Sequence, residues 1–263
     1  MDVTVGIVSE QRGRAGIVMV GSSGLPELDE SPEQVVGIVS GGLDSTTMAF
    51  ALHAAGSQLS LVSFDYGQRH RTELVAARAV AASLGVPHEV IDLRQVGVLL
   101  TGSALTDAHV DVPQGHYTDA SMRRTVVPNR NAIMRDIATG IAVAQGADAV
   151  AFGAHGGDHP IYPDCRPEFV RAFTVMVRLA NAGFISSRFQ VVAPFLSLTK
   201  SEIVRIAARL GVPFELTWSC YEGGTVHCGR CGTCVERREA FTLAGVDDPT
   251  NYALPGRSGD RAG

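Results

Sequence analysis

Short apolar runs alternate along this chain with longer stretches in which apolar residues recur every three or four positions. The runs have the composition of buried parallel strands and lie at residues 36–39, 59–64, 149–152 and 190–195. The stretches with helical spacing lie at residues 74–84, 133–141, 169–179 and 203–210. Repeated strand–helix units predict an α/β fold, with a parallel sheet between two layers of helices and ligands at the carboxyl ends of the strands.

Local signals place the ends of two of these helices. Gly85 follows the apolar stripe that ends at Leu84, as is usual where a helix stops. Thr199 and Glu202 have the spacing of a capping box, so a helix should begin at residue 200. Residues 101–124 show no period and contain Gly, Pro and His, which predicts a long loop of the kind that often covers an enzyme site.

One junction between a predicted strand and a predicted helix contains residues suited to bind a nucleotide. After Val39 the chain reads Ser-Gly-Gly-Leu-Asp-Ser-Thr and then enters a helix over 46–52. Small side chains let the backbone turn with its amides exposed, and amides at a helix N-terminus bind phosphate. Asp44 beside them is suited to hold Mg²⁺ or to position a nucleotide. The candidate nucleotide-binding residues are Ser40, Gly41, Gly42, Asp44, Ser45 and Thr46.

This loop is not a Walker A loop, because it lacks Gly-Lys-Ser/Thr. It is similar to the SGGxDS pyrophosphate loop of ATP pyrophosphatases, which activate carboxyl or carbonyl oxygens by adenylation. The alternative is a Gly-rich turn without a function, as occurs in any α/β protein. The strand before the loop and the Asp-Ser within it favour the functional interpretation.

The chain divides into three parts on this basis. Residues 1–34 are an N-terminal extension, in which apolar residues at 3–7 and 17–20 suggest a β-hairpin, followed by a linker up to Pro32. Residues 35–212 are the predicted nucleotide-binding α/β domain. Residues 213–263 are a cysteine-rich region that ends in a polar, Gly-rich tail.

Composition narrows the class of protein. The chain has 263 residues, of which 45% are hydrophobic and 19% charged, enough for a large core. Its net charge of −5 argues against broad binding to nucleic acid or to a membrane surface. The N-terminus lacks the features of a signal peptide, and no apolar stretch reaches the roughly 18 residues of a membrane helix. We therefore expect a cytoplasmic protein with small-molecule ligands.

The cysteines indicate a metal site. Four of the five cluster near the C-terminus, which in a reducing compartment favours a metal over disulfides; they are Cys220, Cys228, Cys231 and Cys234. Four thiolates suit a closed, structural zinc site, and an iron–sulfur cluster is the alternative. His227 adjoins a ligand and is expected beside the site rather than in it. Cys165 stands apart, as a buried small hydrophobe or as a nucleophile.

Several further motifs occur in the order found in 7-cyano-7-deazaguanine synthases, the nitrile-forming enzymes of the queuosine pathway. Besides the loop at 40–47, they are FDYGQRHR at 64–71, VPNRN at 127–131, YPDCRPEF at 162–169, LTKSEI at 198–203 and TWSCY at 217–221, followed by the cysteines. The chain resembles this family over about residues 35–241. The resemblance implies an adenine nucleotide α-hydrolase-like fold of the ATP pyrophosphatase type, with a C-terminal zinc knuckle of four cysteines.

The resemblance also implies an activity. ATP and Mg²⁺ would activate the carboxylate of 7-carboxy-7-deazaguanine by adenylation, and ammonia would convert it through the amide to the nitrile. Asp44 would serve Mg²⁺ or the phosphates, and Arg130 and Lys200 would neutralise phosphate or acyl-adenylate charge. The implied substrate-binding residues are Tyr162, Asp164, Arg166 and Asp158.

The chain departs from the family pattern in two places. Asp158-His159-Pro160-Ile161 stands where the family usually has Asp-[Phe/Tyr]-Ser-Gly, with His155 just upstream, and the extension 1–34 is unusual. A second hypothesis is therefore a relative that stops at the amide, or joins the activated deazapurine to another amine, even one on a protein. A third is a non-catalytic binding module that acts through the nucleotide loop or the zinc knuckle. A homodimer, and a protein partner for the extension, are further hypotheses.

Overall fold

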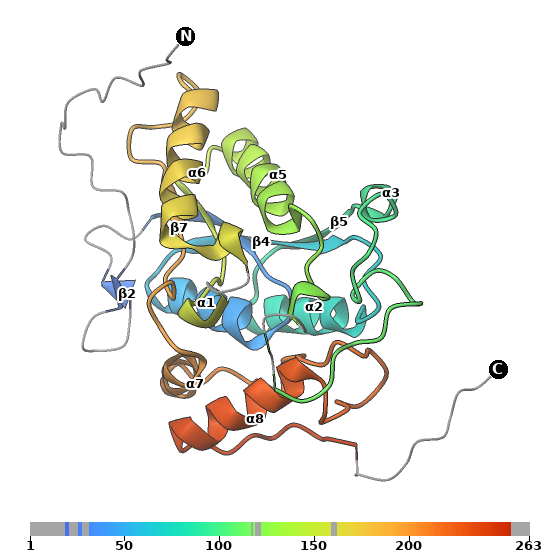
Figure 1. Ribbon diagram of the computed structural model, residues 1–263. Coiled ribbons are helices and arrows are strands. Elements are labelled where there is room, and N and C mark those ends of the chain that lie inside the picture. Colours follow the sequence, from blue (N-terminus) through green and yellow to red (C-terminus); the bar gives the residue numbers. More distant parts are fainter. Residues whose placement is uncertain are drawn as a thin grey trace.

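A five-stranded parallel sheet forms the centre of the structure (Figure 1). The computed structural model describes residues 32–116, 118, 122–158 and 162–253, together with the backbone of 19–20 and 26–27. The strands of the sheet are β3 (Gln34–Ile38), β4 (Gln58–Asp65), β5 (His88–Asp92), β6 (Ala149–Ala151) and β7 (Gln190–Val192). Their order is β5-β4-β3-β6-β7, so the predicted α/β architecture is confirmed.

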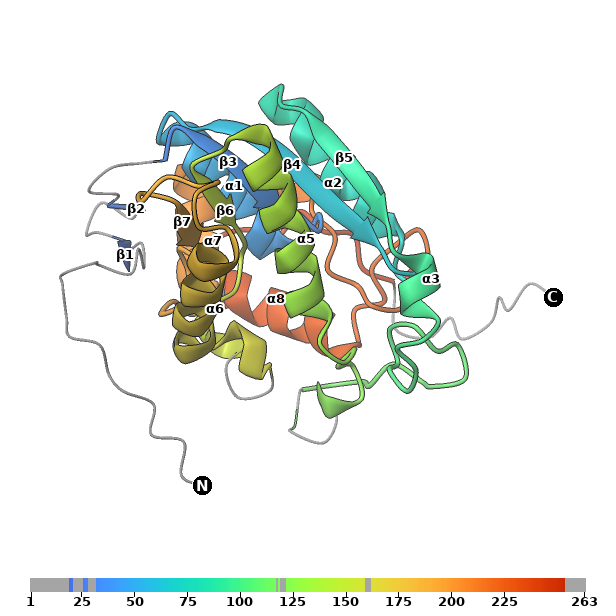
Figure 2. The ribbon, with the colours of Figure 1, turned by 90° about the horizontal axis from the view of Figure 1, so that it is seen from above.

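Helices cover both faces of this sheet (Figure 2). One layer consists of α5 (Arg130–Gln145) and α6 (Pro167–Ala180), and the other of α1 (Leu43–Ala54), α2 (Thr72–Leu84) and α7 (Lys200–Arg209). Side chains alternate along a strand, so Val36 and Val62 pack in the α5–α6 layer while Val35 and Leu61 pack in the other. Because both faces are buried, the strands read as continuous apolar runs.

The helix-end signals in the sequence are confirmed. The Thr199 amide donates to Glu202 Oε2 at 2.8 Å, and the Glu202 amide donates to Thr199 Oγ1 at 3.4 Å, which completes the capping box of α7. Gly85 caps α2 in the left-handed conformation, with φ 66°. Strand β7 ends at Val192, earlier than predicted, because Pro194 lacks the amide that a ladder requires.

Three elements were not predicted from the sequence pattern: the strand β5, the short helix α3 (Arg94–Gly97) and the helix α8 (Gly232–Ala244). Strand β5 lies at the sheet edge and is partly exposed, so it lacks an apolar run. The buried face of α8 contains Cys234 and Arg237, and a face with a thiol and a guanidinium gives no apolar period. Three 3₁₀ turns lie at Gly156–Asp158, Pro163–Cys165 and Phe214–Leu216.

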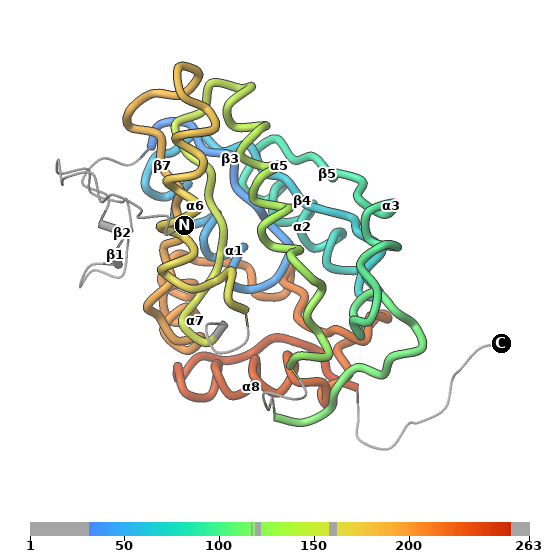
Figure 3. Tube along the Cα trace, turned by 45° about the horizontal axis from the view of Figure 1, so that its top comes forward, coloured from blue at the N-terminus to red at the C-terminus, as the bar shows by residue number. Residues whose placement is uncertain are grey.

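Helix α8 lies beside α7 (Figure 3). It is joined to the sheet domain by a shared hydrophobic cluster. Leu43 of α1 and Val204 of α7 pack in this cluster with Phe214 and Phe241, whose rings meet edge to face at 4.8 Å. The predicted boundary after residue 212 therefore falls inside one hydrophobic cluster. The division into three parts stays a proposal.

The predicted N-terminal hairpin is described only in part. Strand β1 (Met19–Val20) pairs antiparallel with β2 (Pro26–Glu27), which falls within the predicted linker. The predicted first strand at 3–7 and the tail at 254–263 lie outside the described residues. The described part of 101–124 consists mostly of turns, as predicted, and Gln114 forms a β-bridge with Cys231. Among the helices that are described, none combines the length and apolarity needed to cross a bilayer.

Candidate active site

The loop that follows β3 lies where the strand order of the sheet reverses. Strands β4 and β6 flank β3, and ligands of α/β proteins bind at the carboxyl ends of strands at such a switch point. Gly41 has φ 87°, and a Cβ atom on it would lie 2.1 Å from the Glu73 carbonyl oxygen in the first turn of α2. Only glycine permits this approach, so Gly41 brings the loop and α2 into contact.

Hydrogen bonds within the loop give it a defined shape. The Ser40 amide donates to Ser45 Oγ at 3.1 Å, and Ser45 Oγ donates to the Gly42 carbonyl at 3.3 Å. The Trp218 amide donates to the Gly41 carbonyl at 2.8 Å, which ties the loop to the segment before the cysteine cluster. These bonds give the loop the shape of a turn at the start of α1.

A cluster of charged side chains surrounds Asp44. Lys200 Nζ lies 3.1 Å from Asp44 Oδ2 and 3.0 Å from Glu236 Oε2, and His155 Nε2 lies 3.8 Å from Asp44 Oδ2. Burial alone would raise the pKa of Asp44, but Lys200 and His155 outweigh burial and hold that pKa below its usual value. Within the described residues, Asp44 Oδ1 and Thr46 Oγ1 are buried without a hydrogen-bond partner. The carboxylate therefore keeps one oxygen for a ligand.

One cavity of about 260 Å³ opens beside this cluster. The predicted site residues that line it are Ser40, Gly42, Asp44, Ser45, Arg130, Tyr162 and Lys200. Gly41 of the loop and Thr46 of α1 are buried and do not line it, and Asp164 and Arg166 are not in its lining either. The side chain of Asp158, and the whole of His159 to Ile161, lie outside the described residues. The cavity thus unites the loop with residues from all five of the later motifs.

Arg130 enters this cavity from the start of α5. Its Nη1 donates to Tyr66 Oη at 3.2 Å, and its Nε and Nη2 donate to Asn131 Oδ1 at 3.1 and 3.0 Å. Asn131 Nδ2 in turn donates to Asp164 Oδ1 at 3.2 Å. Asp164 is therefore connected to the cavity through Asn131 rather than by lining it. An arginine keeps its charge at any physiological pH, so Arg130 supplies a fixed cation.

Cys165 lies between the apolar cluster of the α5–α6 layer and the cavity. It is 5% exposed and packs in the apolar cluster of the α5–α6 layer, and it also lines the cavity. Asn131 Nδ2 and Arg135 Nη2 each lie 3.7 Å from its Sγ. The Arg135 guanidinium is itself buried, 3.9 Å from the ring centre of Phe152.

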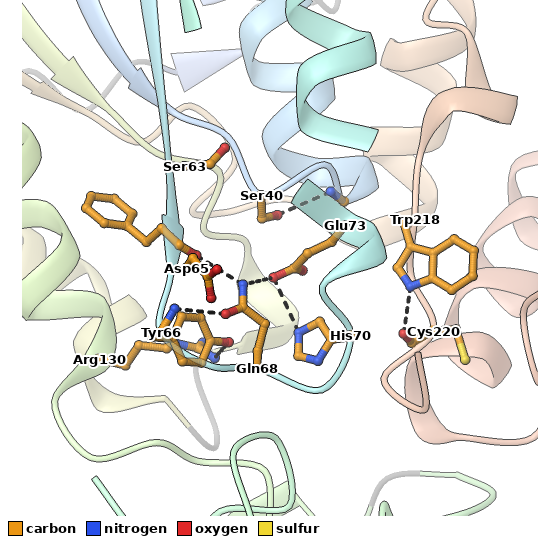
Figure 4. A network of polar contacts seen from close by, with 12 residues as sticks. Ser40, Ser63, Asp65, Tyr66, Gln68, His70, Glu73, Arg130, Trp218 and Cys220 are labelled. Atoms are coloured by element: carbon orange, nitrogen blue, oxygen red, sulfur yellow. Dashed lines mark hydrogen bonds and ion pairs between the residues drawn. The ribbon is translucent and has the colours of Figure 1, made fainter. Parts of the chain in front are cut away.

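A buried polar network at the end of β4 has no role assigned from the sequence (Figure 4). Gln68 Nε2 donates to the Phe64 carbonyl and to Glu73 Oε1, each at 3.0 Å, while Gln68 Oε1 accepts from the Tyr66 amide at 2.9 Å. His70 Nε2 lies 3.4 Å from Glu73 Oε1. Burial raises the pKa of Glu73 to about 7 and lowers the pKa of His70 to about 3. Gln68 and His70 belong to the motif at 64–71, whereas Glu73 lies outside every motif quoted from the sequence.

Lys200 has an unusual position for a cation, at the N-terminal end of a helix. It is the only lysine in the chain. Its ammonium projects from the first turn of α7, where a cation gains nothing from the helix dipole. The two carboxylates of Asp44 and Glu236 hold it there instead.

The four predicted cysteine ligands come together as expected. Their Sγ atoms all lie within 4.8 Å of one another. A tetrahedral ion with metal–sulfur bonds of about 2.3 Å requires sulfur–sulfur distances of about 3.8 Å. The Cys228 amide donates to Cys220 Sγ at 3.3 Å, and the Cys231 amide donates to Cys228 Sγ at 3.2 Å. Such donors stabilise thiolates, so the cluster fits a metal ion.

His227 is not among the ligands, as predicted. Its Nε2 accepts from the Ser219 amide at 3.0 Å, so that lone pair is occupied. Its ring centre lies 4.2 Å from that of Trp218, whose Nε1 donates to the Cys220 carbonyl at 2.8 Å. The single tryptophan of the chain is thus attached directly to the cysteine cluster.

Comparisons with known proteins give a consistent result. A family model described as Queuosine biosynthesis protein QueC matches residues 34–245. Curated relatives from Brucella ovis and Brucella suis, both named 7-cyano-7-deazaguanine synthase, are 59% identical over 215 residues, which cover 82% of this chain and 91% of each relative.

Similarity to solved structures is much more distant. A predicted subunit of tRNA methyltransferase from Methanocaldococcus jannaschii is 15% identical with a TM-score of 0.45, covering 85% of this chain and 93% of that one. The U34-tRNA thiolase NcsA from Methanococcus maripaludis is 16% identical with a TM-score of 0.44, covering 85% and 68%. Likeness at this level carries no argument about function.

We predict that Gly41→Ala distorts the loop. A methyl group there meets the Glu73 carbonyl and is strained at φ 87°, so the free energy of unfolding should fall by about 2 kcal/mol or more in urea denaturation. Gly85→Ala is the matched control, because Gly85 also has positive φ but nothing within 4 Å of the added Cβ. Equal losses in the two variants would contradict a close approach at Gly41.

We predict that Cys228→Ser lowers the metal content and that Cys165→Ser does not, as measured by elemental analysis of the purified proteins. Loss of the metal should also change the fluorescence of Trp218, because its indole is hydrogen-bonded to Cys220. Chelation of the wild-type protein should give the same spectral change. Full metal content in Cys228→Ser would exclude this four-cysteine site.

Proposed function

Because the chain belongs to the queuosine biosynthesis QueC family, we propose that it has the activity for which its curated relatives are named, 7-cyano-7-deazaguanine synthesis. It would act as an ATP-dependent carbon–nitrogen ligase on 7-carboxy-7-deazaguanine and ammonia. The observation that carries this proposal is the single cavity lined both by Asp44 of the phosphate loop and by Tyr162 of the later motif. Adenylation requires such proximity, since the carboxylate oxygen must reach the α-phosphate of ATP.

The comparisons favour the nitrile over the other products considered. The matched relatives carry the nitrile-forming name, and the 59% identity extends over 91% of their length. Neither the amide nor a conjugate with another amine gains support from these relatives. The difference from the family pattern at residues 158–161 involves few positions compared with the length over which the sequences agree.

The chemistry divides into two activations. The carboxylate oxygen of the substrate attacks the α-phosphorus of ATP, pyrophosphate leaves, and ammonia then displaces AMP to give the amide. A second adenylation, on the amide oxygen, makes that oxygen a leaving group. Loss of AMP and the remaining N–H protons gives the nitrile. Each nitrile therefore consumes two ATP.

The protein would contribute position and charge. Backbone amides of residues 40–46 at the N-terminus of α1 would bind the departing pyrophosphate. Lys200 and Arg130, which line the same cavity, would stabilise the negative charge that develops at the phosphate and at the acyl oxygen. Asp44, with its unpartnered Oδ1, would hold the Mg²⁺ that neutralises the triphosphate. Tyr162, Asp164, Arg166 and Asp158 remain the proposed substrate-binding residues.

We assign Zn²⁺ to the cysteine cluster, with a structural role. Four sulfur ligands fill a tetrahedral site and leave no position for a substrate. The thiols must stay reduced to bind a metal, which suits the cytoplasm. A protein partner for the extension 1–34 is a further proposal.

We also propose a homodimer formed through α6. The outer face of this helix and the turn after it expose Val175, Met176, Leu179 and Phe184, which are 58%, 40%, 75% and 82% accessible. An exposed apolar surface of this kind marks an interaction site, and a two-fold axis would bury it against itself.

The activity is tested with ATP, Mg²⁺, ammonium and 7-carboxy-7-deazaguanine, followed by mass spectrometry. The wild-type protein should yield the nitrile and two AMP per product. Lys200→Met should reduce the rate by about 100-fold, because it removes a charge that faces the transition state. Arg209→Met at the exposed end of the same helix is the control and should be active. Unchanged substrate with intact metal would leave only a nucleotide-binding module.

The dimer is tested by light scattering during size-exclusion chromatography. The wild-type protein should elute with twice the 27.7 kDa mass of the chain, and the double variant Leu179→Glu/Phe184→Glu should elute as a monomer. The control double variant Val98→Glu/Leu99→Glu changes exposed apolar residues near α3 and should stay dimeric. A monomeric wild-type protein would reject this interface.

A further inference from the structure

Glu73 is a mostly buried carboxyl group that the proposed mechanism does not use. It lies in the first turn of α2, at the place where that turn packs against Gly41 of the phosphate loop, and it lines the cavity. Its side chain is 13% exposed. The acid is therefore held beside the reaction site by the same backbone contact that shapes the loop.

The two oxygens of Glu73 have different surroundings. Both polar contacts of the side chain, from Gln68 Nε2 at 3.0 Å and His70 Nε2 at 3.4 Å, go to Oε1. Gln68 is itself fixed by bonds to the backbone of Phe64 and Tyr66. Oε2 has no hydrogen-bond partner within the described residues. The network thus orients the carboxyl group and leaves one oxygen for a ligand.

Aromatic side chains also contribute to the wall of this cavity. Tyr66, Trp218 and Tyr221 line the same cavity as Glu73. Aromatic faces attract ammonium ions, and a carboxylate oxygen accepts their N–H bonds. The nitrogen donor of the proposed reaction is such an ion, because ammonia is mostly protonated at neutral pH. It must lose a proton before it can attack a carbonyl carbon.

We propose that Glu73 binds ammonium through Oε2 and accepts the proton whose loss makes ammonia nucleophilic. The inference rests on the proposed function. One N–H proton passes to Glu73, the freed lone pair forms the C–N bond to the acyl carbon, and the C–O bond to AMP breaks with its electron pair leaving on AMP. A second nitrogen proton goes to solvent, which gives the neutral amide.

The charges around Glu73 agree with this role. Burial raises the pKa of Glu73 to about 7, against the opposing effects of Gln68 and Arg130, so the group exchanges a proton near physiological pH. His70, with a pKa lowered to about 3, and Tyr66, with a pKa raised to about 12, are neutral there. Arg130 on α5 carries the positive charge that faces the acid. The negative charge of the Glu73 carboxylate offsets the repulsion between Arg130 and ammonium.

The test separates activation from amination in Glu73→Gln. Activation is measured as exchange of pyrophosphate with ATP that depends on 7-carboxy-7-deazaguanine, without an amine. Amination is measured with ammonium and, separately, with hydroxylamine, which is a neutral amine at neutral pH. The variant should keep the exchange and the hydroxylamine reaction, and its ammonium reaction should fall by about 100-fold. Raising the pH should restore the ammonium reaction as free ammonia accumulates.

Other outcomes overturn the inference. Equal loss of exchange and of both amine reactions would place Glu73 in deazapurine binding or in the fold, and an undiminished ammonium reaction would remove any role. Glu73→Asp keeps the carboxylate but places it farther from the ligand, so this variant should lose less ammonium activity than Glu73→Gln. It provides a second test if Glu73→Gln fails to fold. Glu89→Gln on the exposed side of β5 is the matched control. A wild-type protein without exchange would instead reject the proposed function itself.

Discussion

The close approach of Gly41 to the first turn of α2 is the contact on which the rest of the site depends. There the loop backbone packs against the Glu73 carbonyl, with no room for a side chain. The carbonyl of the same glycine accepts the Trp218 amide. One residue without a Cβ therefore brings together the phosphate loop, the carboxyl group of Glu73 and the segment that leads to the cysteines. Polar groups distant in sequence consequently share one cavity.

The cysteine cluster is connected to the same cavity through α8. This helix begins after Cys231. In its second turn, Glu236 forms an ion pair with Lys200. The next residue, Arg237, is fully buried and donates hydrogen bonds to Thr217, Ser219 and Asp248. Burying a guanidinium is costly unless hydrogen bonds and a counter-charge offset it, as they do here. A metal that fixes the start of α8 would therefore also fix the second carboxylate beside Lys200. A structural metal site can in this way influence a reaction that it does not touch.

Several features of the site could be read from the sequence because each is local. The capping box at Thr199 and the left-handed Gly85 involve residues within one or two turns of each other. The phosphate loop and the cysteine cluster are likewise short motifs. By contrast, α8 was missed because its inner face has a thiol and an arginine where a helical period expects apolar residues.

The sequence by itself determined the parallel α/β fold, the turn at the start of α1 and the grouping of the four cysteines, since strand–helix periodicity and short motifs depend only on neighbouring residues. Only the tertiary structure decided which side chains meet. It placed Lys200 between Asp44 and Glu236 and linked Asp164 to Arg130 through Asn131. It also gave Glu73 a mostly buried position, with one oxygen that has no hydrogen-bond partner among the described residues. The physical reason is that these contacts join residues from separate elements. Their distances and burial follow from the packing of helices on the sheet, which no local pattern contains.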